Sequence, residues 1–181
     1  MDIVGKMMYK LSQGFFYESV SSGQQKPPGM QATIEHLQKI IINYSGRLSA
    51  IPEDSYSHRP GPGKWSKREV LGHLVDSAQN NIRRFVVAQY EDTPRIVYDQ
   101  DKWVAIAHYQ HYPTDDLISL WTLLNRHICL LLQHVSPEAA RARCAASDRT
   151  KHTIEWLAAD YCNHLLHHLH QILELDPIAY P

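Results

Sequence analysis

The stretch PGPGKWSKREVLGHLVDSAQNNIRRF, residues 60–85, joins a helix-breaking run of Pro and Gly to a strong helix start. Ser66 and Glu69 have the S-x-x-E spacing of a capping box, in which each side chain binds the other residue's backbone N–H. The apolar residues that follow recur every three or four positions, as on one face of a helix. They are Val70, Leu71, Leu74, Ala78, Ile82 and Phe85. The stretch therefore predicts an amphipathic helix over residues 66–90, whose apolar face needs partners.

Three further segments have helical periodicity, and we find no sustained alternation of apolar and polar residues typical of a half-buried strand. These segments cover residues 33–50, 114–135 and 153–174. Thr114, which two Asp residues follow, is expected to cap its helix. Because four amphipathic helices without strands can bury their apolar faces only against one another, we predict an all-α four-helix bundle.

A long connection separates the second and third predicted helices. Residues 91–113 can return along the whole length of a helix, so these two helices can run parallel. The middle of the connection, YDQDKWVAIAHYQ (residues 98–110), contains apolar residues that we expect to lie across the bundle as a lid. We therefore predict a long crossover between the second and third helices.

The N-terminal part of the chain differs in composition from the rest. Residues 21–29, SSGQQKPPG, are polar and rich in Gly and Pro, which is typical of a linker. We assign residues 1–30 to an N-terminal extension with its linker, and residues 31–181 to one bundle domain. Lys6 and Lys10 interrupt the apolar patch before the linker, so we expect neither a signal peptide nor a membrane span.

Charge and cysteine content narrow the class of protein. The chain has 18 Lys and Arg against 19 Asp and Glu, without a basic run, so nucleic acid is not an expected partner. Cys129, Cys144 and Cys162 are an odd number of cysteines without a C-x-x-C pair, which favours reduced thiols in the cytoplasm. The sequence also has no G-x-S-x-G elbow for a serine nucleophile and no P-loop.

Histidine is the compositional outlier, with 12 residues, and HLLHHLHQ at 164–171 contains four of them. On a helical wheel, His164 and His168 lie at one edge of the apolar stripe, with the i, i+4 spacing that lets both imidazoles reach one metal ion. His167 and His170 fall on the far side, and we expect them to face water. No metal role is expected for His36, His58, His108, His111, His127, His134 or His152.

His73 lies at the corresponding edge of the second helix. The same edge continues through Ser77, Asn80 and Arg84. A third imidazole from this helix would complete a set of three ligands with open positions, as in catalytic zinc sites. Asp160, one turn before His164, is a candidate acceptor for a ring N–H. From the residues alone two interpretations stay open, because His164 and His168 can also be ordinary histidines of an amphipathic helix, and His73 a hydrogen-bonded histidine at the core boundary.

Two stretches resemble the signature helices of the DinB/YfiT-like superfamily: residues 60–85 and DYCNHLLHHLHQI, residues 160–172. The resemblance spans nearly the whole predicted domain. Within the superfamily, the sequence is similar in particular to a branch of metal-dependent enzymes and thiol S-transferases. It implies a four-helix bundle with a long crossover. It also implies a metal triad made of His73, in the W-S-x-x-E-x-x-x-H-L context, with His164 and His168 from H-x-x-x-H.

The resemblance implies a metal-dependent enzyme that acts on a small molecule, and three hypotheses follow. In the first, which we favour, the open metal position binds a low-molecular-weight thiol as thiolate and directs it at an electrophile, so that the enzyme is a thiol S-transferase. In the second, the same position activates water against an amide or ester, although the sequence offers no strong proton carrier. In the third, the metal only ties helices together. Nickel or zinc is expected, with iron and manganese also compatible with imidazole ligands. We further expect a homodimer and no organic cofactor.

Overall fold

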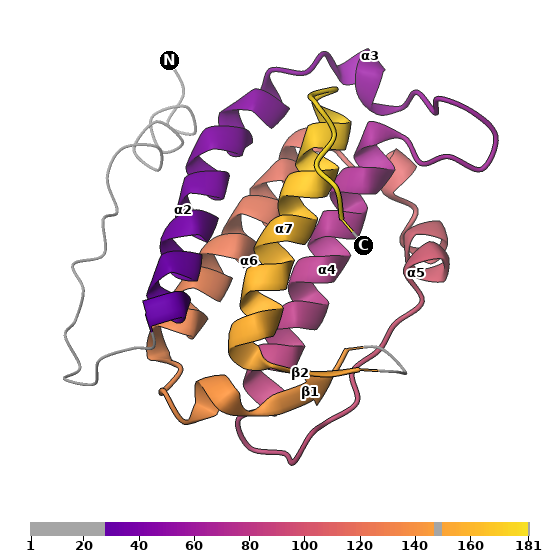
Figure 1. The fold of residues 1–181 in the computed structure, drawn as a ribbon. Helices are drawn as coiled ribbons and strands as arrows, with labels where there is room; N and C mark the ends of the chain where they lie inside the picture. Colours follow the sequence, from indigo (N-terminus) through magenta and orange to yellow (C-terminus); the bar gives the residue numbers. More distant parts are fainter. Residues whose placement is uncertain (1–27, 147–149, 181) are drawn as a thin grey trace, which may run out of the picture.

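The computed structural model describes residues 28–146 and 150–180, and four long helices dominate it (Figure 1). They are α2 (Pro28–Ser49), α4 (Lys67–Val87), α6 (Thr114–His134) and α7 (Ile154–Ile172). These helices match the four predicted segments, and the all-α four-helix bundle is confirmed. The predicted N-terminal extension lies outside the described residues except for its last three positions.

The helices run up, down, down and up in chain order (Figure 1). Each of α4 and α2 packs against both α6 and α7. The first turns of α4 and α6 meet, because Arg68 Nε donates to Thr114 Oγ1 at 3.1 Å. The first turn of α4 also meets the end of α7, where Lys67 Nζ lies 2.7 Å from Glu174 Oε1. The second and third long helices are therefore parallel neighbours, which requires the long crossover that the sequence predicted.

The apolar stripes of the four helices meet in one core. Its largest fully buried side chains include Trp121, Phe85, Met30, Ile34, Leu71, Leu74 and Ile128. Each full burial of such an apolar side chain contributes about 1.5–3 kcal/mol relative to exposure, so the stripes account for the association of the helices. Asn125 is also buried, and its Oδ1 accepts a hydrogen bond from the Tyr161 hydroxyl at 2.8 Å, which ties α6 to α7 through a satisfied polar pair.

The predicted capping box begins α4 at Ser66. Ser66 Oγ accepts the Glu69 backbone N–H at 3.2 Å, and Glu69 Oε2 accepts the Ser66 N–H at 2.8 Å. At the start of α6 the expected cap is wrong, because Pro113 is the N-cap and Thr114 makes no capping hydrogen bond. The Thr114 hydroxyl instead accepts from the guanidinium of Arg68.

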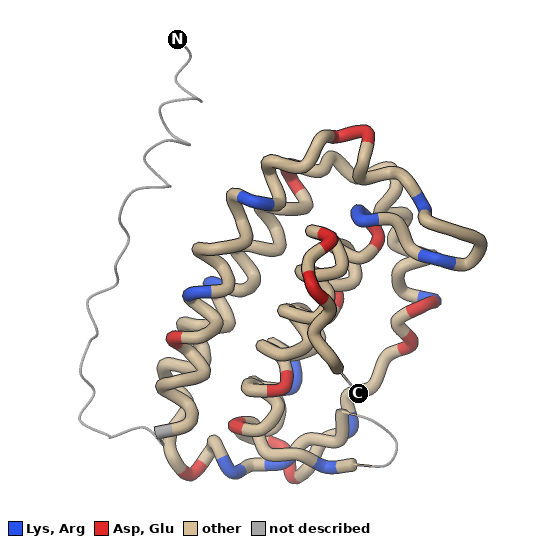
Figure 2. Tube along the Cα trace, turned by 45° about the horizontal axis from the view of Figure 1, so that its top comes forward, with Lys and Arg blue, Asp and Glu red and all other residues tan. Residues whose placement is uncertain are grey.

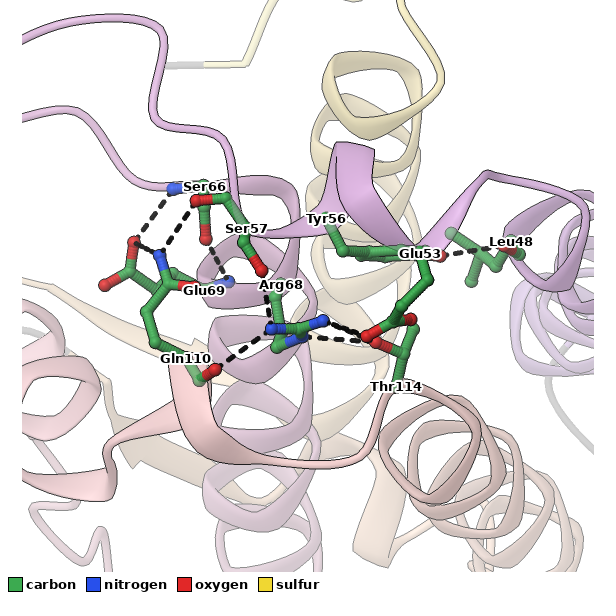
Figure 3. A network of polar contacts seen from close by, with 9 residues as sticks. All are labelled: Leu48, Glu53, Tyr56, Ser57, Ser66, Arg68, Glu69, Gln110 and Thr114. Carbon is green, nitrogen blue, oxygen red and sulfur yellow. Dashed lines mark hydrogen bonds and ion pairs between the residues drawn. The ribbon is translucent and has the colours of Figure 1, made fainter.

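Arg68 is buried at the end of the bundle where α4 and α6 begin, and Figure 3 shows its polar partners. The guanidinium donates to Thr114 Oγ1, to Ser57 Oγ at 2.8 Å and to the Gln110 carbonyl at 2.9 Å. It also pairs with Glu53, whose side chain is 65% exposed. One side chain thus holds together the first turn of α4, the first turn of α6, the end of the crossover and the segment before α4.

The crossover between α4 and α6 is folded rather than a free loop. It contains helix α5 (Gln100–Ala107) and the 3-10 turn η1 (Tyr109–His111), and both pack against α4. Val104 and Tyr109 are buried in this contact, while Ile106 is 73% exposed. Val104 and Tyr109 therefore cover part of α4, as expected of a lid, whereas Trp103 and Ile106 of the same crossover stay exposed.

Short elements that periodicity did not predict complete the described chain. Helix α3 (Glu53–Tyr56) follows α2, and a second 3-10 turn, η2 (Ala139–Arg141), follows α6. Strands β1 (Arg143–Ala145) and β2 (Lys151–Thr153) pair antiparallel just before α7. The expectation of no strands was wrong here, because three residues are too few to show an alternation. Helix α2 also begins five residues earlier than predicted, since Pro28 is compatible with a first helical turn, where no N–H is needed.

Charges of both signs are interspersed along the described elements (Figure 2). This distribution agrees with the balanced composition of the sequence. Among the described residues, no helix has the length and apolar content needed to cross a lipid bilayer.

Candidate metal centre

The structure brings His73 of α4 together with His164 and His168 of α7. The ring centroids lie 5.0 Å apart for His73 and His164, 4.9 Å for His73 and His168, and 4.7 Å for His164 and His168. One nitrogen from each ring lies within 4.8 Å of the other two. The two helices are antiparallel neighbours, and the predicted edges of their apolar stripes face each other. Three imidazoles from the predicted positions therefore converge on one point.

In two of these rings, those of His164 and His168, Nδ1 forms a hydrogen bond, which leaves Nε2 as the nitrogen that can bind a metal ion. His164 Nδ1 lies 3.3 Å from Ser77 Oγ, and His168 Nδ1 lies 3.0 Å from Gln171 Oε1. An amide oxygen can only accept, so Nδ1 of His168 carries the proton and its Nε2 keeps a lone pair. His73 Nε2 lies 3.0 Å from His164 Nε2. Nε2 of His73 and Nε2 of His164 thus face each other, and the hydrogen bond at Nδ1 of His168 leaves Nε2 of that ring for a metal ion.

Burial keeps the three imidazoles neutral. Burial and, secondarily, the neighbouring His168 lower the pKa of His73 from 6.5 to about 3. The same cause, with the adjacent histidines, lowers the pKa of His164 to about 2, and burial also lowers the pKa of His168. Metal ions bind neutral imidazole, so three imidazoles that stay neutral near pH 7 are suited to metal binding. The donor atoms, their spacing and their protonation state therefore fit a divalent metal ion.

A pocket of about 480 Å³ opens beside the three histidines. Its walls come from α4, α7, the crossover, the β-hairpin and the C-terminal segment. Polar residues of its wall include Ser77, Arg84, Tyr98, Asp160, His167 and Tyr180. The volume lies in the range of small-molecule sites, about 300–1,000 Å³. The histidine cluster thus forms part of the wall of a pocket that a small molecule can enter.

The predicted role of Asp160 as hydrogen-bond acceptor for His164 is wrong. Asp160 Oδ2 instead accepts the Tyr180 hydroxyl at 2.9 Å, and Ser77 occupies the place beside His164 Nδ1. The reason lies in the tertiary structure, since Ser77 comes from α4 and Tyr180 from the C-terminal segment, neither of which the wheel of α7 includes.

The expectation that His167 and His170 face water is also wrong, since both are half-buried. His167 Nδ1 lies 2.7 Å from the Ile178 carbonyl, and His170 Nδ1 lies 2.8 Å from the Asp176 carbonyl. His170 Nε2 also bonds the Tyr44 hydroxyl at 2.9 Å. The chain after α7 folds back along this face and covers it (Figure 1). Neither residue belongs to the three-histidine cluster.

Some neighbours of the site escaped the sequence reasoning. Tyr98, from the crossover, forms a hydrogen bond with Ser77 and lines the pocket, and burial raises its pKa to about 12. Tyr180 packs its ring 5.3 Å from the ring of His164. Gln171 could have been recognised by its i+3 spacing from His168, but Tyr98 and Tyr180 lie in segments without periodicity and gave no signal.

The cysteines take no part in this site. Cys129, Cys144 and Cys162 are buried free thiols. Burial raises the pKa of Cys129 and of Cys162 to about 12, so neither is a ready nucleophile at neutral pH. Cys162 is 1% exposed and packs as a small apolar residue in the core.

Comparison with known proteins gives a consistent result. The profile of the DinB superfamily matches residues 36–172. The protein OB0782 of Oceanobacillus iheyensis, named as a candidate metal-dependent hydrolase, is 31% identical over 143 residues, which cover 78% of this chain and 81% of that protein. YfiT of Bacillus subtilis, with the same kind of name, is 30% identical over 161 residues, or 88% of each chain.

A solved structure supports the fold independently. It is that of YfiT from Bacillus subtilis, described as a probable metal-dependent hydrolase with an unusual four-helix bundle topology. It superposes with a TM-score of 0.72 at 23% identity, over 86% of this chain and 94% of that one. The profile match, the relatives and the bundle agree, and the chain belongs to the DinB superfamily.

Proposed function

We propose that the protein is a metal-dependent hydrolase of a small molecule, with His73, His164 and His168 as the ligands of one divalent ion. The observation that carries this proposal is the convergence of three neutral imidazoles on the wall of an open pocket. Structural zinc sites normally use four protein ligands, whereas catalytic sites use three and leave a position for water or substrate. The three-histidine set therefore favours catalysis over a purely structural metal.

A divalent ion held by three imidazoles would polarise a carbonyl and lower the pKa of water. The protein's own residues would supply orientation and proton handling. Ser77 fixes the ring orientation of His164 through Nδ1 of that ring, and Gln171 does the same for His168. OB0782 and YfiT are both named as candidate metal-dependent hydrolases, and this supports hydrolysis as the reaction class.

Asp160 is the residue that we assign as proton acceptor in the pocket. It lies one helical turn from His164, about 6 Å along the axis of α7. The Tyr180 hydroxyl binds one carboxylate oxygen, which holds the side chain toward the pocket. A positioned carboxylate within reach of the substrate is the group that general base catalysis requires. Asp160 would thus supply the proton carrier for hydrolysis that the sequence alone did not identify.

Transfer of a low-molecular-weight thiol, which the resemblance implied, would use the same open position. The open position accepts either a thiol or water, and no feature of residues 28–146 and 150–180 favours the thiol. Thiol transfer is therefore the alternative reaction that the test below includes. Nickel or zinc stays the expected metal, with iron or manganese as alternatives. The cytoplasmic location and the homodimer also stay predictions.

The test begins with metal analysis of the full chain purified without chelators. Wild type should carry about one divalent ion, His168→Ala should lose it, and His127→Ala, a matched change of an exposed histidine on α6, should keep it. The loaded protein is then screened with panels of amides and esters, and separately with thiols and electrophiles. Hydrolysis that Asp160→Asn abolishes without loss of metal supports the proposal. Thiol conjugation without hydrolysis would replace it, and metal without any turnover would indicate a structural role.

A further inference from the structure

His73 and Asp76 each have one buried polar atom without a hydrogen-bond partner in the part of the chain that the structure describes. These atoms are His73 Nδ1 and Asp76 Oδ2. The residues are 1% and 0% exposed, and these two atoms are shielded from bulk water. Buried polar groups in native proteins are normally hydrogen-bonded, and an unpartnered one calls for an explanation. Two such atoms on neighbouring side chains point to one shared cause.

The spacing of these two residues recurs at another ring of the cluster. His73 and Asp76 are three residues apart on α4, which places them on one face, about 5–6 Å apart between Cβ atoms. On α7, His168 and Gln171 have the same i, i+3 spacing, and there the Nδ1 to Oε1 distance is 3.0 Å. His164 also has an oxygen at Nδ1, that of Ser77. Asp76 therefore stands where the third ring, His73, would find its acceptor.

A contact from the crossover holds Asp76 by its other oxygen. The Tyr109 hydroxyl donates to Asp76 Oδ1, and the Tyr109 ring packs on Gly72, where a Cβ would come within 2.2 Å of ring carbon. This arrangement leaves Oδ2 as the oxygen still able to accept. Burial raises the pKa of Asp76 to about 7, although the hydrogen bond from Tyr109 acts to lower it.

We propose that Asp76 is a positioning residue for the metal centre, whose Oδ2 accepts the Nδ1–H of His73 when His73 holds a divalent ion through Nε2. The proposal rests on the metal site proposed above and adds to it a carboxylate that fixes the tautomer and orientation of the most buried ligand. Carboxylates bonded to a ligating histidine raise its basicity, and their loss lowers metal affinity by about 10- to 100-fold. Asp76 would thus connect the crossover, through Tyr109, to the metal centre.

The test measures cobalt(II) affinity of the full chain by competition with a chelator, together with the cobalt absorption spectrum. Asp76→Asn should weaken cobalt binding by about 10- to 100-fold and alter the spectrum. The melting temperature of the metal-free variant should not fall, because the amide oxygen can still accept from Tyr109. Asp116→Asn, the same change at an exposed site on α6, should leave the cobalt affinity and the cobalt spectrum unchanged. Tyr109→Phe should lower the melting temperature of the metal-free protein but change cobalt affinity less than Asp76→Asn does.

Two outcomes separate this inference from the proposed function. If wild type binds cobalt and Asp76→Asn binds it equally tightly, Asp76 has only a structural role and the inference is overturned. If wild type binds no cobalt, the metal site itself falls, and the inference with it. Should Asp76→Asn not fold, NMR of the zinc-loaded wild type decides: a slowly exchanging Nδ1–H on His73 is expected, and an Nδ1 without a proton overturns the proposal.

Discussion

Replacing Arg68 with Met should destabilise the protein by about 3 kcal/mol. The side chain is 6% exposed, and it donates to three uncharged partners, on Thr114, Ser57 and Gln110. A hydrogen bond from a charged group contributes about 1.5–3 kcal/mol, but burial also removes water from the guanidinium, so we take about 1 kcal/mol net for each partner. Met keeps most of the apolar volume of the arginine stem. The ion pair with Glu53 adds less than about 1 kcal/mol, because the Glu53 side chain is 65% exposed and can turn to water.

Thermal unfolding followed by circular dichroism measures this effect. For a chain of this size each kcal/mol corresponds to about 2–4 °C, so the midpoint should fall by roughly 6–12 °C. Lys67→Met is the matched control on the adjacent residue, because the partner of Lys67, Glu174, is 76% exposed. The control should change stability by less than about 1 kcal/mol. An Arg68→Met variant within about 0.5 kcal/mol of wild type would refute the argument that this network joins the first turns of α4 and α6.

Three further predictions concern the site and the thiols. Replacing His73, His164 or His168 with Ala should lower metal occupancy at least tenfold by elemental analysis, and a retained ion would remove that residue from the ligand set. In metal-free protein, the folded pKa values of His73 and His164, about 3 and about 2, lie below the ordinary 6.5, so the unfolded chain binds more protons at acidic pH. Stability should therefore be highest above about pH 6.5 and fall as the pH decreases toward the folded values. Because the raised pKa of Asp76 acts in the opposite direction, urea midpoints of the metal-free Asp76→Asn variant at pH 7.5 and 5.5 measure the histidine effect, and equal midpoints would contradict it. Buried Cys129 and Cys162 should react with a thiol reagent only at the rate of opening in native protein and at once in denaturant, and fast native labelling would contradict their burial.

The local sequence determined the four long helices and the positions of the three histidines on them. Ser66 and Glu69 fix the start of α4 through bonds within one turn, and that local chemistry can be read without a fold. The edge position of His73 and the i, i+4 spacing of His164 and His168 follow from the helical period alone. Once the apolar stripes pack, the edges that carry these residues must face each other, so the wheel and the structure select the same three positions.

Only the tertiary structure decided the surroundings of that cluster. Tyr98 and Tyr180 come from the crossover and the C-terminal segment, whose paths depend on the bundle being already formed. For the same reason Asp160 turns to Tyr180 rather than to His164, and His170 bonds Tyr44 of another helix instead of water. Periodicity gives the direction of a side chain relative to its own helix axis, whereas the partner it meets depends on segments distant in sequence, which no local pattern encodes.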